Sequence, residues 1–204
     1  MKTRQEIKSI SKQHFSNNYW VSVGAVILAM FIVGVASGVT FGLGAIFFVP
    51  PIMVGLQYFT LCLYRGETPN IETMFTVGFS NYGRKLGGML WMYLFTYLWT
   101  LLLIVPGIIK GIAYSLTPYI LADCPNVTAT DALKLSMRMT QGHKGEIFVM
   151  YLSFIGWFLL SFITAGIVGI FYSNPYYFVS LAGLYEELKN NALNNGTVTS
   201  TDLA

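Results

Sequence analysis

Three long stretches of the chain are almost free of charged residues, and this feature restricts the possible folds more than any other. Residues 13–64 and 147–185 contain no Asp, Glu, Lys or Arg, and residues 91–122 contain only Lys110. A transmembrane helix needs about 20 predominantly apolar residues, so each stretch with its immediate flanks can supply two helices joined by a turn. A small aqueous domain could not bury three such stretches, and we therefore expect three helical hairpins in a membrane.

The expected fold class is all-α: a polytopic helical membrane protein with about six transmembrane helices in three hairpins, packed as a compact bundle. The hairpins cover residues 20–64, 89–122 and 147–185, within a single membrane domain of residues 20–187. Composition agrees, because charged residues make up 10% of the chain, against about a quarter in a typical soluble domain. The fourth span, residues 108–122, is short, and the sequence leaves open whether it crosses the bilayer completely.

Glycine and proline mark the positions where these helices should turn, bend or pack closely. Gly34, Gly38 and Gly42 recur at every fourth residue, which gives a flat surface for another helix. The alternative is that glycines simply gather near a turn. Proline supplies no amide donor, so Pro50 and Pro51 should kink the second span or delay its start. The other candidate hinges are the turn residues Pro106 and Gly107 and the last-span residue Pro175.

The polar linkers between the hairpins are predicted to form cytoplasmic amphipathic helices at the membrane surface, over residues 69–82 and 129–141. In each linker, apolar side chains recur at helical spacing on one side and polar side chains on the other. Lys134 and Arg138 lie on the polar side of the second helix. The expected N-caps are Thr68 and Thr128.

Both ends of the chain are polar. Residues 1–19 carry four basic residues, with apolar side chains at helical spacing. They are expected to form either an amphipathic surface helix or a solvated lead-in to the first span. Residues 188–204 are expected to be a polar, disordered tail. The first apolar run greatly exceeds the roughly 7–15 residues of a signal-peptide core, so we expect no cleaved signal.

The linkers resemble each other at a nearly constant offset. Pro69-Asn70-Ile71 is matched by Pro125-Asn126-Val127, and Tyr93-Leu94 is matched 58 residues later by Tyr151-Leu152. We interpret this pattern as a unit of surface helix plus hairpin that is used three times, with a less similar copy at the N-terminus.

The basic residues give the expected orientation. With six spans, all Lys and Arg residues except Lys110 fall on the side of the two termini. By the positive-inside rule that side faces the cytoplasm, so both termini and both linkers are expected to be cytoplasmic. The outer side then consists of three short turns, which argues against a receptor for soluble external ligands.

Three basic residues are candidate contacts for a lipid or another anion. Lys110 lies in the middle apolar stretch, and no acidic residue shares its span. It either extends to the outer interface or holds a lipid phosphate or an anionic substrate. Lys134 and Arg138 are the corresponding candidates on the cytoplasmic side.

Other reactive residue types are isolated. Cys62 and Cys124 have no metal-ligand spacing, and Glu186 and Glu187 are expected to be solvated at a helix end. No hydrolase, protease or phosphate-binding motif is found, and no Arg/Lys cluster suits nucleic acid. The sequence therefore predicts no catalytic residue, no metal site and no cofactor.

Three segments carry a family resemblance: LLLIVPGIIKGIAYSLTPYILAD, DALKLSMRMTQGHKGEIF, and LSFIGWFLLSFITAGI followed by NPYY and LYEEL. They resemble the bacterial integral membrane proteins called domain of unknown function 975 (DUF975), which are common in Gram-positive bacteria. The resemblance runs from the second span onward and is looser in the first. It implies a multi-pass protein of the bacterial cytoplasmic membrane, and it brings no established activity and no functional residue.

The leading functional hypothesis is a non-enzymatic integral membrane protein with a structural, interaction or membrane-homeostasis role. Its expected partners are the lipid bilayer, anionic lipids of the inner leaflet, and another membrane protein or a second copy of the chain. The alternative is a transporter or lipid-moving protein, because spans broken by Pro and Gly can line a cavity. An intramembrane enzyme ranks third, since catalytic motifs are missing.

Overall fold

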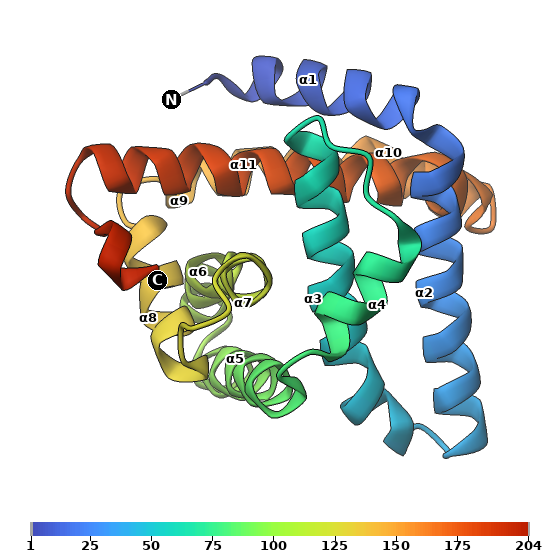
Figure 1. Ribbon diagram of the computed structural model, residues 1–204, viewed down its shortest axis with the longest axis horizontal. Helices are drawn as coiled ribbons and strands as arrows, with labels where there is room; N and C mark the ends of the chain where they lie inside the picture. Colours follow the sequence, from blue (N-terminus) through green and yellow to red (C-terminus); the bar gives the residue numbers. More distant parts are fainter. Residues whose placement is uncertain (1, 204) are drawn as a thin grey trace.

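The structure is a computed structural model that describes residues 2–203, and every regular element in that range is a helix (Figure 1). The all-α fold class predicted from the sequence is confirmed. The elements are α1 (Arg4–Asn17), α2 (Tyr19–Val39), α3 (Leu43–Tyr64), α4 (Ile71–Phe79), α5 (Tyr82–Leu102), α6 (Ile104–Tyr114), α7 (Thr117–Asp123), α8 (Ala129–Met139), α9 (Lys144–Leu152), α10 (Ile155–Ile163), the π-helical turn η1 (Gly169–Ser173), α11 (Asn174–Asn194) and the 3₁₀ turn η2 (Ser200–Asp202).

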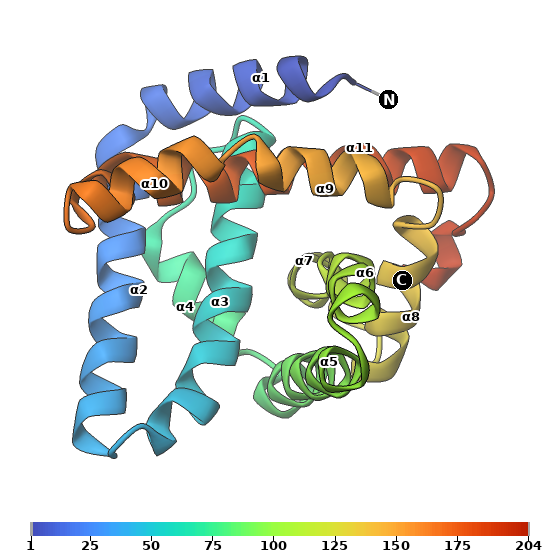
Figure 2. The same ribbon diagram turned by 180° about the vertical axis from the view of Figure 1, so that it is seen from behind.

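Along the chain, one short helix is followed by two long helical segments, and this order occurs three times. Helices α2 and α3 follow α1, and we call them the first arm. Helix α5 and the broken helix α6–α7 follow α4 and form the second arm. Helices α9 and α10, with η1 and α11, follow α8 and form the third arm. Within each arm the two segments run back along each other (Figures 1 and 2) and are in contact.

Four helical segments are long and apolar enough to cross a membrane. They are Tyr19–Val39, Leu43–Tyr64, Ile104–Asp123 and Lys144–Ile163, with mean hydropathies of 2.3, 1.8, 1.3 and 1.9. The helices that run beside the last two, α5 and α11, are long as well but carry charged residues. Segments of this length and composition are those of a membrane protein.

The three arms point in different directions (Figures 1 and 2), so they do not form the compact bundle expected from the sequence. In Figure 1 the first arm runs vertically, the third arm runs horizontally, and α5 of the second arm is seen nearly end-on. The arms meet through the C-terminal halves of their second segments. There Leu61 of α3, Ile120 of α7 and Ala182 of α11 are completely buried in the main core.

The opposite ends of the arms, which we call the tips, are apolar and exposed. Phe41 at the turn of the first arm is 98% exposed, Phe162 near the turn of the third arm is 87% exposed, and Ile104 at the turn of the second arm is 71% exposed. Removing each such side chain from water is worth about 1.5–3 kcal/mol. These side chains are therefore stabilised by an apolar or interfacial environment that the protein itself does not supply.

The short helices α1, α4 and α8 bury their apolar sides against the protein. Ile7 and Phe15 of α1 are buried where α1 contacts α11 and α3. Met74 of α4 is buried against α3, and Leu135 and Met139 of α8 are buried where α8 contacts the second arm. Residues 1–19, which the sequence left open between a helix and a tail, thus contain a packed helix.

The caps of the two linker helices follow the predictions in part. Thr128 begins α8 as predicted, because its hydroxyl accepts a hydrogen bond from the Asp131 amide at 3.2 Å. The N-cap of α4 is Asn70 and not Thr68. The Asn70 side chain accepts from the Glu72 amide at 3.3 Å, which places the helix start two residues later.

The second arm reverses direction at Leu103, three residues before the predicted turn at Pro106 and Gly107. Pro106 lies instead in the first turn of α6, where its missing amide costs no helical hydrogen bond. Gly107 allows α6 to lie directly on α5, because an added Cβ would come within 2.4 Å of the Thr100 hydroxyl. The Pro-Gly pair therefore follows the turn and does not form it.

The other prolines lie inside or at the start of helices. Pro50 and Pro51 are within α3, which bends in its N-terminal part (Figure 1), as expected for residues that lack an amide donor. Pro175 lies in the first turn of α11, directly after the π-helical turn η1. The helix is thus irregular directly before Pro175, which supplies no amide donor.

Close helix contact through glycine occurs in α3 and α4, away from the predicted glycine pattern. An added Cβ would lie 2.1 Å from the Met74 carbonyl oxygen at Gly55 and 2.6 Å from the Pro51 carbonyl oxygen at Gly78. At Gly34 and Gly38 no described atom lies within 4 Å of the added Cβ. The predicted surface is therefore not used inside residues 2–203.

Gly42 has φ +91° and forms the turn of the first arm, the conformation for which glycine is favoured. The expected disordered tail is folded, because α11 continues to Asn194 and Val198 is buried in the core. Asp202, near the end, reaches Arg138 of α8.

Candidate functional site

Charged residues from all three arms meet at one place, which we call the junction. Arg65 ends α3, Asp123 ends α7, and Lys189 lies on α11. The Arg65 guanidinium lies 2.9 Å from the Asp123 carboxylate, and it also pairs with Glu186 of α11. Lys189 contacts the second oxygen of Asp123. The junction thus ties the ends of the three second segments together by ion pairs.

The Asp123 carboxylate is held in place by further hydrogen bonds around it. The Tyr185 hydroxyl donates to the Asp123 carboxylate at 3.0 Å. The guanidinium of Arg84, at the start of α5, donates to the carbonyls that end α7, those of Leu121 at 2.6 Å and Cys124 at 2.9 Å. A cation at a helix C-terminus satisfies carbonyls that have no helical partner. Arg84 therefore fixes the end of α7 and positions Asp123.

Burial makes the junction sensitive to loss of any one partner. The Asp123 side chain is 8% exposed and that of Lys189 is 19% exposed. Burial alone would lower the pKa of Arg65, but pairing with Glu186 and Asp123 outweighs it and raises that pKa. Removing one partner of a buried pair leaves an uncompensated charge, which is strongly destabilising.

A second ion pair joins the N-terminus to α11 beside the junction. The Lys2 amide donates to one oxygen of Glu187 at 2.8 Å, and the Lys2 ammonium lies 2.9 Å from the other. This pairing raises the pKa of Lys2. Burial alone would raise the pKa of Glu187, but the hydrogen bonds from Lys2 bring it below its usual value. The expectation that Glu186 and Glu187 are simply solvated at a helix end is therefore wrong.

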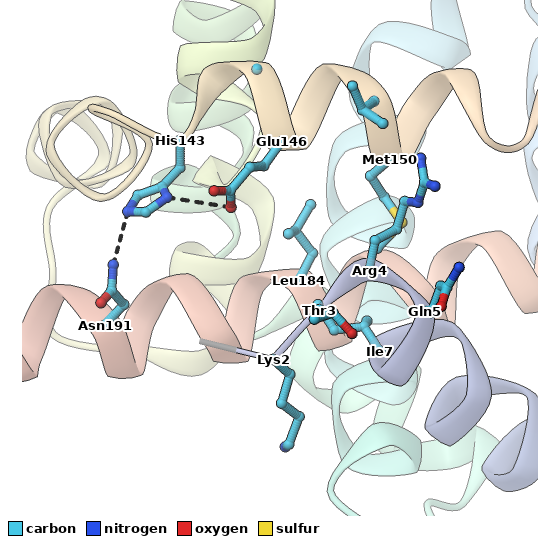
Figure 3. Close-up of a pocket in the computed structure, with 12 residues that line it drawn as sticks. Lys2, Thr3, Arg4, Gln5, Ile7, His143, Glu146, Met150, Leu184 and Asn191 are labelled. Atoms are coloured by element: carbon cyan, nitrogen blue, oxygen red, sulfur yellow. Dashed lines mark hydrogen bonds and ion pairs between the residues drawn. The ribbon is translucent and has the colours of Figure 1, made fainter.

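A cavity of about 910 Å³ opens between α1, α9 and α11, next to the Lys2–Glu187 pair (Figure 3). Its floor is apolar, because Ile7, Met150 and Leu184 are almost completely buried. Its rim is polar and includes Arg4. The full lining is Lys2, Thr3, Arg4, Gln5, Ile7, His143, Gly145, Glu146, Val149, Met150, Leu184 and Asn191.

The polar side of the cavity next to α9 is organised by His143 (Figure 3). The Asn191 side-chain nitrogen lies 2.8 Å from His143 Nε2. An amide nitrogen can only donate, so Nε2 is the acceptor and Nδ1 carries the proton. His143 Nδ1 then faces the Glu146 carboxylate at 3.4 Å. The Asn191 contact ties α9 to α11, whereas His143 Nδ1 is buried without a hydrogen-bond partner among the described residues.

The three predicted anion contacts lie outside this cavity. The Lys110 ammonium lies 5.1 Å above the Trp99 ring, between the two segments of the second arm. Lys134 pairs with Asp131 at 2.9 Å and Arg138 with Asp202 at 3.5 Å, both on the exposed side of α8. Lys134 and Arg138 share one helix, whereas Lys110 belongs to α6.

The residues of the junction have a weak signal in the sequence. Each of the three charge-poor stretches is followed directly by a charged residue: Arg65, Asp123 and Glu186. Arg65 and Asp123 are also 58 positions apart, the offset that relates Tyr93 to Tyr151. These residues resemble ordinary charged helix ends, so their mutual contact could not be inferred without the arrangement of the arms.

Comparison with known proteins gives one match. The family described as "Protein of unknown function (DUF975)" matches residues 88–192, just over half of the 204-residue chain. The match covers most of the second arm, α8, and the third arm through Ala192. Searches of curated proteins and of solved structures found no match. The chain therefore belongs to the DUF975 family, whose function is unknown.

Proposed function

We propose that the protein is a non-enzymatic component of the bacterial cytoplasmic membrane, with a structural, interaction or membrane-homeostasis role. In this proposal all three arms enter the lipid, which gives six membrane-crossing segments in three hairpins. The junction, the short helices and both termini lie on the cytoplasmic side. The three tips reach the other side.

The separation of charge from apolar surface along every arm carries this proposal. At the junction Arg65, Asp123 and Lys189 form buried ion pairs. At the tips Phe41 and Phe162 are almost fully exposed. A water-soluble protein rarely exposes a contiguous apolar surface of this extent, whereas a bilayer provides an apolar solvent along the arms, its outer interface for the tips, and water for the charged ends.

Two segments, α5 and η1 with α11, are not among the four most apolar helices. In this proposal they cross the membrane beside helices that are. α5 packs against α6, and η1 packs against α10. Each therefore runs beside a segment apolar enough to cross the membrane. In this proposal acyl chains surround each arm separately, because the arms diverge (Figure 2) and do not pack as a compact bundle.

The orientation rests on the basic residues. Arg65, Arg84 and Lys189 all act at the junction, and the positive-inside rule assigns such a side to the cytoplasm. Lys110 is the exception among the basic residues, because it lies in the part of the second arm that is proposed to enter the membrane. Its ammonium lies over the Trp99 ring. A lysine stacked on an aromatic ring can lie near an interface without a carboxylate partner.

The transporter alternative has less support than the structural role. Coupled transport commonly uses an ionisable group inside the membrane, and the acidic residues Asp123, Glu186 and Glu187 are engaged in ion pairs at the junction. The cavity of about 910 Å³ also lies at the polar ends of α1 and α9. A smaller cavity between α3 and α5 is lined by apolar side chains and Tyr93.

Membrane integration is tested by extraction. Membranes from cells that express the full chain are washed with alkaline carbonate and then with a mild detergent. An integral protein stays in the pellet during the first wash and is released by the second. Release by carbonate alone would contradict the proposal, because it would show that the arms are not surrounded by lipid.

A further inference from the structure

We propose that the cavity between α1, α9 and α11 binds the polar end of an anionic phospholipid, whose acyl chain follows the outer surface of α9 and α10. This inference rests on the proposed function, because it requires α9 and α10 to lie in the membrane. It adds a specific lipid site to that role and uses residues outside the junction.

The cation Arg4 lies at the edge of the cavity. Among residues 2–203, Arg4 has no hydrogen bond or ion pair from its side chain, whereas Lys2 beside it is neutralised by Glu187. Figure 3 shows the Arg4 side chain directed towards Met150 of α9. A guanidinium in this position can bind a phosphate through two parallel N–H donors.

The start of α9 lines the same cavity and adds donors to it. Its first helical hydrogen bond runs from the Ile147 amide to the His143 carbonyl, so the amides of Lys144, Gly145 and Glu146 precede it. His143 is the N-cap, and its side chain makes no capping hydrogen bond. Helix amides of this kind favour a negatively charged group. The Glu146 carboxylate, which would repel an anion, is directed at His143 (Figure 3).

The apolar part of the cavity continues out of it along the third arm. The floor formed by Ile7, Met150 and Leu184 is buried. Val149 at the edge is 43% exposed, and further along α9 and α10 the exposed apolar side chains include Leu159. The full set of exposed apolar side chains on the two helices is Phe148, Val149, Leu152, Ile155, Phe158, Leu159, Leu160, Phe162 and Ile163.

This combination selects a lipid over a free anion. Inorganic phosphate would use Arg4 and the α9 amides but would leave the exposed apolar side chains of α9 and α10, such as Val149 and Leu159, uncovered. A phospholipid covers both, and its chain lies where α9 and α10 would meet the bilayer. The shared chemistry is a phosphate group, and the two sources can be separated experimentally.

The test uses the purified full chain in detergent, with binding of phosphatidylglycerol and phosphatidylcholine measured by native mass spectrometry. We expect a preference for phosphatidylglycerol. Arg4→Gln should weaken phosphatidylglycerol binding about ten-fold, since it removes charge-assisted hydrogen bonds. Lys12→Gln is the matched control, because it removes the same charge from an exposed position of α1 outside the cavity, and it should leave binding unchanged.

A second pair of variants blocks the cavity sterically. No described atom lies within 4 Å of an added Cβ at Gly145 or at Gly87, so both positions accept a larger side chain. Gly145→Leu should narrow the cavity and reduce phosphatidylglycerol binding, whereas Gly87→Leu on α5 should not. Excess inorganic phosphate should fail to displace the lipid.

The outcomes separate this inference from the proposed function. If the protein resists carbonate extraction but Arg4→Gln and Gly145→Leu bind phosphatidylglycerol like the wild type, the lipid site is wrong and the membrane role stands. If phosphate displaces the lipid as well as phosphatidylglycerol itself does, the site binds a free anion and the lipid inference is overturned. If carbonate releases the protein, both proposals fail together.

Discussion

Arg65 and Asp123 form an ion pair of 2.9 Å although they are 58 residues apart. Each follows the last buried turn of the second segment of its arm, Arg65 after α3 and Asp123 at the end of α7. The third arm joins the same pair through Lys189 and Glu186. Ion pairs therefore connect equivalent ends of the three arms to one another. These contacts hold the arms in their diverging directions.

Asp123→Asn should destabilise the protein by about 3–5 kcal/mol, the usual cost of breaking a buried pair. The substitution keeps the shape of the side chain but leaves Arg65 and Lys189 facing each other without their shared counter-charge. Asp131→Asn is the matched control, because the Asp131–Lys134 pair is exposed and such pairs are worth less than about 1 kcal/mol. Thermal unfolding in detergent measures both. Equal losses in the two variants would contradict a special role for the junction.

Gly55→Ala should separate α3 from α4. The added Cβ would lie 2.1 Å from the Met74 carbonyl oxygen, and a backbone atom cannot move aside as a flexible side chain can. Overpacking of this kind costs about 1–3 kcal/mol. Gly34→Ala meets no described atom within 4 Å and should be neutral or gain up to about 1 kcal/mol from helix propensity. Gly55→Ala should therefore lower the unfolding temperature, whereas Gly34→Ala should leave it unchanged or raise it. Equal shifts would argue against the close α3–α4 contact.

Acidification should weaken the attachment of the N-terminus to α11. The pKa of Glu187 is lowered in the folded protein by the hydrogen bonds from Lys2. Its contribution to the free energy of unfolding is therefore present above the unfolded pKa of about 4.3 and is lost as the pH falls through the lower folded pKa. Glu187→Gln should remove this part of the acid sensitivity, and the effect should not add to that of Lys2→Met. Additive effects in the double variant would show that the two residues act independently.

Lys85 should give a stability change in the alkaline range. It is 2% exposed, and its ammonium donates to the Val77 carbonyl and to the Ser80 hydroxyl at 2.8 Å. Burial, followed by repulsion from Arg84, lowers the pKa of Lys85 to about 8. Between that value and the unfolded pKa of about 10.4, the unfolded chain binds the extra proton, so stability rises with pH.

Lys85→Met should abolish this rise between pH 8 and 10. The measurement is the unfolding temperature of both proteins across that range in the same detergent. A wild-type curve that is flat or falls over this interval, with no difference between the two proteins, would show that Lys85 stays charged in the fold.

The all-helical class and the long apolar helices could be predicted from the sequence, because charge-free stretches of this length rarely form anything other than apolar helices. Local signals also gave the cap at Thr128. The turn of the second arm was misplaced because Pro106 suits the first turn of a helix as well as a loop. Whether such a proline forms the turn or begins the next helix depends on packing against other segments. The local sequence does not contain that information.

The arrangement of the arms and the junction could not be predicted for a related reason. Arg65 and Asp123 look like ordinary charged helix ends, and their pairing depends on contacts between distant segments. The glycine spacing of Gly34 and Gly38 resembles a packing surface, yet the close contacts occur at Gly55 and Gly78. A spacing pattern shows that a helix can be approached closely, but the other elements of the fold decide which side of it is covered.

The background for the most direct test is a variant without native cysteines. Cys62 and Cys124 are both free and buried, so Cys62→Ala and Cys124→Ala remove reactive thiols without altering the exposed surface. Single cysteines are then placed at the tips, in Phe41→Cys, Leu103→Cys and Phe162→Cys. Lys134→Cys on α8 reports on the side of the junction.

The decisive measurement is the reaction of these single cysteines with a membrane-impermeant maleimide in intact cells. The account predicts that the three tip cysteines are labelled from outside, whereas Lys134→Cys is labelled after the membrane is permeabilised. Labelling of Lys134→Cys in intact cells, with the tip cysteines protected, would contradict the claim that the arms cross the membrane from a cytoplasmic junction.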